Sequence, residues 1–199
     1  TTTPPLPSGY PAGINDAQIV SMLQHTGQNL CYVTGGWSYS GQPYASPLYV
    51  YDPAAGTFTH LGAFTYAPAD LMDHVAWYVP WVGGGAVCIA GGRYRYDTGV
   101  VYADSQCYVL GAGVFNVPNA DLGPLPEAWQ AVGDAWWVHD GQYEIWGFHG
   151  MDASFQTQTA FYAAQSQPFA YGPAPVYDFL ATEGDNYDGS IWVANGSTA

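Results

Sequence analysis

The sequence predicts an all-β fold built from repeated four-stranded units, and three observations predict it. Short aromatic and β-branched runs, separated by many of the 25 glycines and 15 prolines, fill the 199-residue chain. No long stretch has the 3.6-residue periodicity of an amphipathic helix, and the best candidate, residues 15–25, is short. Two sets of marker residues also recur with a common spacing of about 56 residues, which is typical of repeat architectures.

The first set of markers is a short apolar run that ends in glycine. It occurs three times, and its glycines stand 56 residues apart. Glycine at the end of a strand permits a positive φ and a close approach of neighbouring backbones. Two of the runs end in a glycine pair, whereas the third keeps one glycine followed by Phe148. The runs are LCYVTGG (30–36), AVCIAGG (86–92) and YEIWGFHG (143–150), with Gly35, Gly36, Gly91, Gly92 and Gly147 as the marker glycines.

The second set of markers is a Tyr that is followed seven residues later by a Phe. Three copies of this pair occur, with steps of 57 and 54 residues between them. We expect the two rings to pack as large apolar wedges between neighbouring sheets. The pairs are Tyr51 and Phe58, Tyr108 and Phe115, and Tyr162 and Phe169.

An earlier apolar run begins each unit, at 17–25, 72–80 and 129–140, so each unit is predicted to hold four short strands. Four antiparallel strands in about 50 residues are typical of one blade of a β-propeller. An ordinary β-sandwich of two or three hairpins is the alternative. Sandwiches rarely carry a matched period of this length, so the pattern favours the propeller.

The combined pattern resembles the kelch family, which has an apolar strand ending in Gly-Gly, then a Tyr, six residues and an aromatic residue. The stretch LYVYDPAAGTFTHLG (48–62) is the nearest copy, and the resemblance covers about residues 15–175 as three repeats. It implies a kelch-like propeller of four-stranded antiparallel blades. The chain has Phe where the family usually has Trp, so the partners of the family do not transfer to it.

The repeats also predict how the chain is divided. A fourth unit has only two candidate strands, VYDFLATE (176–183) and SIWVANG (190–196), which gives about 3.5 blades. A closed propeller typically needs four or more blades, so a missing segment, a donated strand or a second copy has to supply the rest. The predicted parts are an extended Thr/Pro-rich segment (1–14) and a propeller (15–199) with blades at about 15–66, 70–126 and 127–175 and a half blade at 176–199.

Charge excludes several classes of partner. The chain has no lysine, and Arg93 and Arg95 face 16 acidic residues, for a formal net charge of -14. Nucleic acids and anionic membrane surfaces both require clustered basic residues, so neither is an expected partner. No run of 18 apolar residues predicts a membrane span. With 9% charged residues, a Thr/Pro-rich opening and a glycosylation sequon at Asn195, the chain is expected to be secreted or exposed on a cell surface.

Two of the three cysteines can face each other. Cys88 lies on a glycine-ended strand and Cys107 begins the next strand, at equal distances from a loop centred near 97–98. A cross-strand disulfide and a pair of buried free thiols are both open at this point. Cys31, on the equivalent strand of the first repeat, is expected to be a buried free thiol.

No catalytic constellation stands out. The sequence has no G-x-S-x-G motif, no histidine pair with metal-binding spacing, and no match to the Tyr–Cys and histidine set of the copper radical oxidases found among kelch-like propellers. We therefore predict no enzyme, no cofactor and no metal, and we interpret DNYDG (185–189) and RYRYDTG (93–99) as loops. Aromatic loop residues can stack on sugars or proteins, or pack between blades: Trp37, Tyr39, Tyr44, Trp81, Tyr94 and Tyr96.

The predicted function is that of a non-enzymatic extracellular structural or interaction module that self-associates. Its expected partners are other copies of itself or a strand-donating chain, in a closed dimer or an open filament, with glycans or other proteins as further candidates. Two alternatives stay open. One is a segment of a secreted propeller enzyme, either an oxidase or a carbohydrate-active enzyme, and the other is a lectin-like sugar binder.

Overall fold

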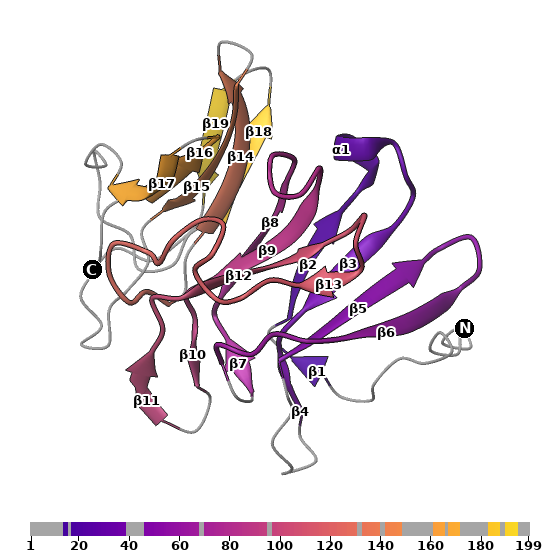
Figure 1. Ribbon diagram of the computed structural model, residues 1–199, viewed down its shortest axis with the longest axis horizontal. Coiled ribbons are helices and arrows are strands. Elements are labelled where there is room, and N and C mark those ends of the chain that lie inside the picture. Colours follow the sequence, from indigo (N-terminus) through magenta and orange to yellow (C-terminus); the bar gives the residue numbers. More distant parts are fainter. Residues whose placement is uncertain are drawn as a thin grey trace.

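The regular secondary structure of the described residues is almost entirely β-strand, which confirms the predicted all-β class (Figure 1). One four-residue helix, α1 (Leu23–Thr26), is the exception in the part of the chain that the structure describes. In that part, no helix is long and apolar enough to cross a membrane. The computed structural model describes residues 14–15, 17–38, 46–67, 70–94, 97–130, 133–139, 142–148, 161–165, 167–171, 183–187 and 190–194.

Three sheets contain four strands each, and in each sheet the strands are antiparallel and follow one another in chain order. The first sheet consists of β2 (Gln18–Ser21), β3 (Cys31–Thr34), β5 (Pro47–Asp52) and β6 (Thr57–Ala63). The second consists of β8 (Val75–Val79), β9 (Ala86–Ala90), β12 (Ser105–Val109) and β13 (Val114–Phe115). The third consists of β14 (Gly133–His139), β15 (Gln142–Phe148), β16 (Phe161–Ala164) and β17 (Gln167–Tyr171).

Three smaller sheets accompany them, and they correct two predicted loops. Residues 93–99 contribute to two strands, because Arg93 and Tyr94 pair with Met72 and Leu71 and so extend the ladder beyond the glycine pair. The DNYDG stretch begins inside a strand, since its first three residues pair with β19. The smaller sheets are β1 (Ile14–Asn15) with β4 (Trp37–Ser38); β7 (Leu71–Met72) with β10 (Arg93–Tyr94) and β11 (Asp97–Val101); and β18 (Glu183–Tyr187) with β19 (Ser190–Ala194).

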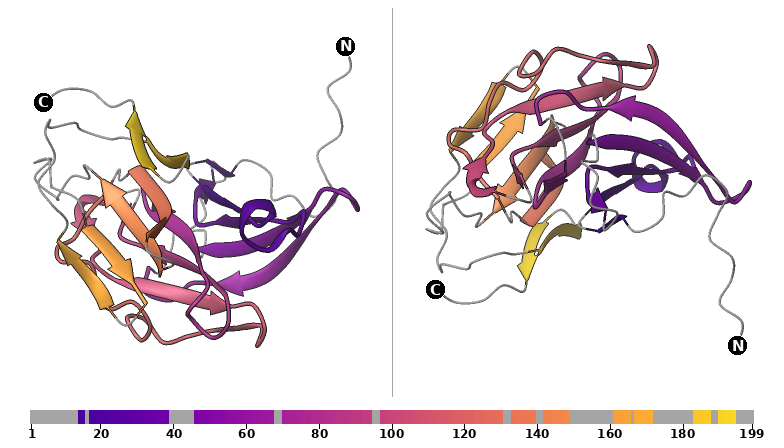
Figure 2. Two further views of the ribbon diagram at one scale, coloured as in Figure 1. Left: turned by 90° about the horizontal axis from the view of Figure 1, so that it is seen from above. Right: turned by 90° about the horizontal axis from the view of Figure 1, so that it is seen from below.

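The first strands of successive units lie next to one another. Strand β2 contacts β8, β8 contacts β14, and β14 contacts β18 of the last hairpin. Strand β18 begins at Glu183, and residues 176–182 of the strand predicted there fall outside the described residues. Figure 2 shows the three large sheets in chain order, with the second between the first and the third.

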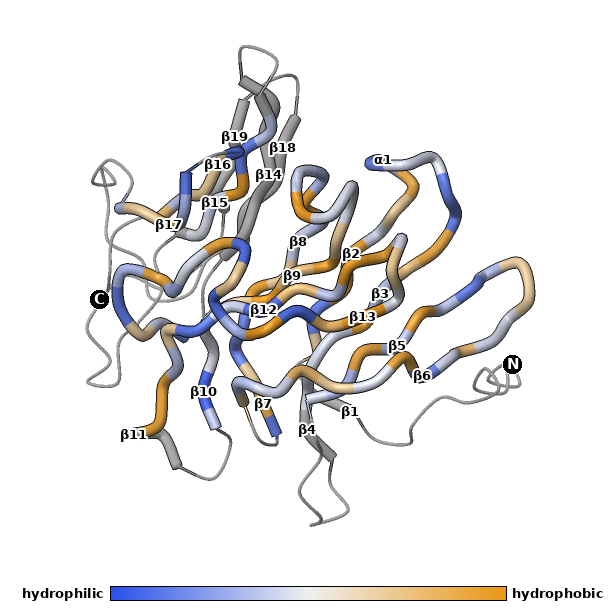
Figure 3. Tube along the Cα trace, viewed as in Figure 1, coloured by the Kyte–Doolittle hydropathy of each residue, from blue (hydrophilic) through white to orange (hydrophobic). Residues whose placement is uncertain are grey.

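The second sheet is the centre of the described fold. Every residue of β8, β9 and β12 is buried, so both faces of this sheet are covered. Apolar positions follow β9 and also β5 of the first sheet (Figure 3). Where the first two sheets meet, Val20, Tyr32 and Leu48 share a core with Ala76, Tyr78 and Ile89. Where the second and third meet, Trp77, Cys88 and Cys107 share a core with Ile145, Phe161 and Phe169.

The two glycine pairs have nearly the same conformation. The first glycine of each pair has φ 61° or 64° and the second has φ 90° or 87°, a region that L side chains rarely adopt. The first donates to a carbonyl at the beginning of the third strand, and the second donates to a carbonyl at the start of the next unit. The bonds are Gly35 N to Pro47 O (2.9 Å), Gly36 N to Leu71 O (2.8 Å), Gly91 N to Asp104 O (3.0 Å) and Gly92 N to Trp129 O (2.7 Å).

The third unit departs from this arrangement. Gly147 lies within β15, directly opposite Phe161, and Phe148 continues the strand. A Cβ at position 147 would overlap the Phe161 ring, which is fully buried. The third glycine therefore serves close packing rather than a turn.

The aromatic pairs are also alike in the first two units and different in the third. Tyr51 lies opposite Phe58 with ring centroids 4.6 Å apart, and the second pair, Tyr108 and Phe115, is likewise opposed at 4.8 Å. The third pair is not opposed, because Tyr162 pairs with Ala170 next to a register irregularity. There, Tyr162 stacks on Trp146 and Phe169 packs against Trp77 and Phe161.

Candidate functional site

The predicted loop aromatics are not brought together in the described residues. Trp37 and Tyr94 belong to strands β4 and β10, so the prediction that they are loop residues is wrong. Trp81 lies in the turn that precedes β9, whereas Tyr94 follows the glycine pair at the other end of that strand. Tyr39, Tyr44, Tyr96 and the sequon residue Asn195 lie outside the described residues.

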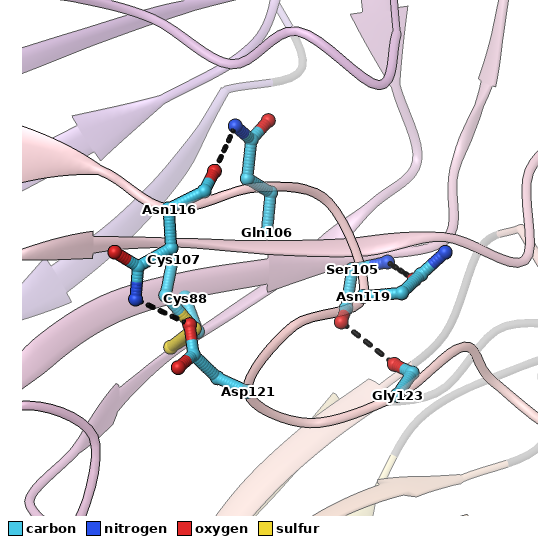
Figure 4. Close-up of a disulfide and its surroundings, with 8 residues drawn as sticks. All are labelled: Cys88, Ser105, Gln106, Cys107, Asn116, Asn119, Asp121 and Gly123. Atoms are coloured by element: carbon cyan, nitrogen blue, oxygen red, sulfur yellow. Dashed lines mark hydrogen bonds between the residues drawn. A yellow bond between two sulfur atoms is a disulfide. The ribbon is translucent and has the colours of Figure 1, made fainter.

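Cys88 and Cys107 form a disulfide bond across β9 and β12 (Figure 4). They are directly opposite in the ladder, with a Cα–Cα distance of 4.0 Å, and both are buried. The sequence had left a disulfide and two free thiols open, and the structure has the disulfide. Cys31 is free, as expected, but it is partly buried, whereas a buried thiol was expected.

Beside the disulfide, polar side chains hold the segment that follows the two-residue strand β13 (Figure 4). Asn116 accepts a 2.7 Å hydrogen bond from Gln106 through its carbonyl and donates a 2.7 Å bond to Asp121 through its side chain. Ser105 donates to the carbonyl of Gly123 over 2.7 Å. Backbone bonds from Asn116 N to Cys107 O (2.9 Å) and from Asn119 N to Ser105 O (2.8 Å) hold the same segment against β12.

One face of the first sheet carries the clearest candidate interaction surface. Side chains of a strand alternate between the two faces, and the face with Val20, Tyr32 and Leu48 is buried against the second sheet. The other face is partly exposed, and Ile19, at 66%, is its most exposed large apolar side chain. We call this surface the open face, and it consists of Ile19, Ser21, Cys31, Val33, Tyr49, Tyr51, Phe58 and His60.

The same ladder positions are buried in the second sheet. When Gly35 is aligned with Gly91, the paired residues Ile19, Val33 and Tyr49 of the first sheet correspond to Ala76, Ile89 and Gln106 of the second. The pair Cys31 and Tyr51 corresponds to Val87 and Tyr108. In the second sheet these positions are all buried, because the first sheet covers them. The corresponding residues are Ala76, Val87, Ile89, Gln106 and Tyr108.

Aromatic rings cover the middle of the open face. Tyr49 lies with its ring centroid 4.9 Å from that of His60 and 6.5 Å from that of Phe58. Phe58 in turn stacks on Tyr51. None of the eight residues of the open face is Asp, Glu, Lys or Arg, although the chain has a net charge of -14. The open face can therefore bury apolar and aromatic surface without desolvating a charge of its own.

A second candidate surface lies where the turns between the first and second strands of three units meet. Its residues are His25 of α1, Tyr78 of β8, Trp81 of the following turn and Tyr143 of β15, and we call them the ring cluster. The Tyr143 hydroxyl and His25 Nδ1 are 2.7 Å apart, and the His25 and Tyr78 rings lie 5.0 Å apart. Trp81 lies 6.0 Å from the Tyr143 ring.

Burial keeps the ring cluster uncharged. It lowers the pKa of His25 and raises the pKa of Tyr143, which the nearby Tyr78 raises further. Both rings are therefore neutral at pH 7 and present hydrogen-bonding groups without charge. Of the ring cluster, the sequence analysis named only Trp81. His25 and Tyr143 lie at equivalent turns of the other two units, and this repeated position was the signal that could have found them.

In the described part of the chain, no group of three or more His, Cys, Asp or Glu side chains is arranged to hold a metal ion. His74 illustrates why a lone histidine is not a ligand site here. It is buried between the first and the second sheet, where its Nε2 atom lies 2.9 Å from the Thr34 hydroxyl oxygen. A Cβ on Gly35 would overlap its ring, so this histidine packs directly against the glycine pair.

Comparison with known proteins assigns no family to the chain. No family model matches the sequence, and no curated protein matches it significantly. The kelch-like resemblance therefore rests on the repeat itself, and the functional proposal rests on the surfaces described above.

Proposed function

We propose that this chain is a kelch-like β-propeller module, without enzymatic activity, that works outside the cell and associates with further copies of itself. The propeller is supported by three four-stranded antiparallel meanders whose first strands lie in a row. The two glycine pairs, with matching φ values and matching hydrogen bonds to the next unit, support a repeated blade.

Self-association is carried by one observation: in the described residues, no third strand lies beside the last hairpin. Strand β18 contacts β14 as the first strand of a fourth unit, and β19 occupies the place of the second strand. In the three preceding units the second strand pairs with a third strand, but β19 pairs only with β18 among the described residues. An unpaired strand edge is a template for another strand, and a second copy can supply one by β-augmentation.

The extracellular assignment is supported by the disulfide. Cys88 and Cys107 are bonded, and structural disulfides persist mainly in oxidising compartments such as the extracellular space. The low content of charged residues and the absence of lysine agree with a surface that is not adapted to bind nucleic acid.

Sedimentation velocity over a concentration series tests the proposed function. We expect dimers or larger assemblies at micromolar concentration, and we expect added salt to favour them, because each copy carries a formal charge of -14 that salt screens. Hydrogen exchange at residues 190–194 should slow as the assembly forms. A chain that stays monomeric throughout the series, with these amides already protected, contradicts the proposal.

The ring cluster favours a second candidate function, the binding of a neutral sugar. Aromatic faces stack on the apolar faces of sugars, and the hydrogen-bonded His25–Tyr143 pair places no charge beside them. A glycan array identifies the ligand, and Trp81→Ala is expected to weaken its binding about tenfold. Tyr94→Ala is the matched control, since Tyr94 lies beyond the other end of β9. Equal loss in both variants, or no glycan bound, removes this candidate.

A further inference from the structure

We infer that the open face of the first sheet is the surface on which a second copy of the chain docks, in a head-to-tail contact with its β18–β19 hairpin. This inference rests on the proposed self-association and adds a side-chain contact to the backbone pairing proposed for β19. The open face belongs to the first of the described sheets, whereas the β18–β19 hairpin lies at the other end of the row of first strands.

The structure itself shows what covers a face of this kind. In the second sheet, the positions equivalent to the open face are buried under Val20, Tyr32 and Leu48 of the preceding sheet. Ile89, which corresponds to Val33, is fully buried there. The matching partner of the open face is therefore another β-sheet of the same repeat, placed one position earlier in the row.

The row of first strands identifies which sheet of the second copy takes that position. The row runs from β2 through β8 and β14 to β18 in the described residues. A hairpin β18–β19 placed beside β2 of the next copy continues the row, so the contact repeats one that the chain already makes three times. Ile19 of β2, which is 66% exposed, lies at that junction.

The open face adds no charge of its own to this contact, since none of its eight residues is Asp or Glu. The hairpin of the second copy carries Glu183 and Asp185, and added salt screens the repulsion between copies that have a formal charge of -14 each. The contact is heterologous, since it joins two different surfaces. It closes into a ring or continues as a filament, depending on the rotation that relates one copy to the next.

Cys31 provides a direct readout, because it lies on the open face and the other two cysteines of the chain are bonded to each other. The rate at which iodoacetamide alkylates Cys31 is measured over the same concentration series as sedimentation. We expect the rate to fall in proportion to the free fraction of the face, about tenfold when nine-tenths of the protein is assembled.

A matched pair of variants assigns the effect to the surface. Ile19→Asp is expected to keep the protein monomeric and Cys31 reactive at all concentrations, with an unchanged circular dichroism spectrum. Val117→Asp, at a residue 74% exposed beside the second sheet, is expected to assemble like the wild type. Ile19→Ser replaces the first variant if the aspartate prevents folding.

The outcomes separate this inference from the proposed function. Assembly with unchanged Cys31 reactivity, or an Ile19→Asp variant that assembles normally, overturns the open-face contact and leaves self-association standing. A wild type that never assembles overturns both. Mild oxidation of the assembly distinguishes the orientation of the copies. A dimer cross-linked through Cys31 of both copies shows that two open faces meet, and it overturns the head-to-tail contact. Protection of Cys31 without this cross-link supports the head-to-tail contact.

Discussion

Replacing both Cys88 and Cys107 with alanine is expected to lower the free energy of unfolding by about 3 to 5 kcal/mol. The two residues are 19 positions apart, and cross-linking a loop of that length restricts the unfolded chain by about 3 kcal/mol. The remainder comes from the sulfur atoms, which are buried in the core with Trp77 and Phe161. Denaturation in urea, with fluorescence of the tryptophans as the probe, measures the difference.

Cys31→Ala is the control for the loss of a cysteine side chain, since Cys31 is free and only partly buried. Its effect on stability is expected to stay within about 1 kcal/mol. In the wild type, the disulfide should resist dithiothreitol under native conditions and become reducible only when the protein unfolds, because Cys88 and Cys107 are 0% and 1% exposed. A double variant as stable as the wild type would show that the bond adds nothing to the fold.

The strands of the first two units follow from the sequence because their determinants are local. The glycine pairs that begin at Gly35 and Gly91 permit positive φ, and in both units the first N–H of the pair bonds to a carbonyl at the start of the third strand. The opposition of Cys88 and Cys107 follows from counting outward from the loop between them. These features depend on chain spacing and backbone sterics, both of which are visible in the sequence.

The third unit shows where spacing alone fails. A step of 54 rather than 57 residues placed Tyr162 in line with Tyr51 and Tyr108, but the ladder places it opposite Trp146. The register irregularity next to Tyr162 moves the two aromatic residues to different faces of the sheet. A shift of one residue exchanges the faces of a strand, and packing of Phe161 against Trp77 and Trp129 decides which register is favoured.

The open face could not be predicted because both faces of the first sheet are apolar in sequence. Val20 and Ile19 are equally hydrophobic neighbours, yet one is 5% and the other 66% exposed. Only the position of the second sheet decides which face is covered, and that position is a tertiary property. The contact between His25 and Tyr143, which are 118 residues apart, has the same origin.

Acid is expected to destabilise the protein through His74, with a loss of up to about 5 kcal/mol as the pH falls from 6.5 to 3. Burial lowers the pKa of His74 from 6.5 to about 3, and a hydrogen bond to Thr34 opposes this shift. Between these values the unfolded chain binds a proton that the folded chain excludes. The stabilisation is therefore complete above pH 6.5, and each further pH unit of acidification removes about 1.4 kcal/mol of it.

Carboxyl groups also titrate in this range, so a comparison between variants isolates the histidine. His74→Gln removes the titrating ring, and its unfolding free energy should fall less steeply with acid than that of the wild type, even if its stability at pH 7 is lower. An NMR titration of the labelled imidazoles checks the cause directly, because His74 should remain neutral to about pH 4 in the folded protein. A His74 resonance that titrates near pH 6 would contradict the prediction, since a ring held between Gly35 and Thr34 without access to water cannot accept a proton at that pH while the two sheets stay packed.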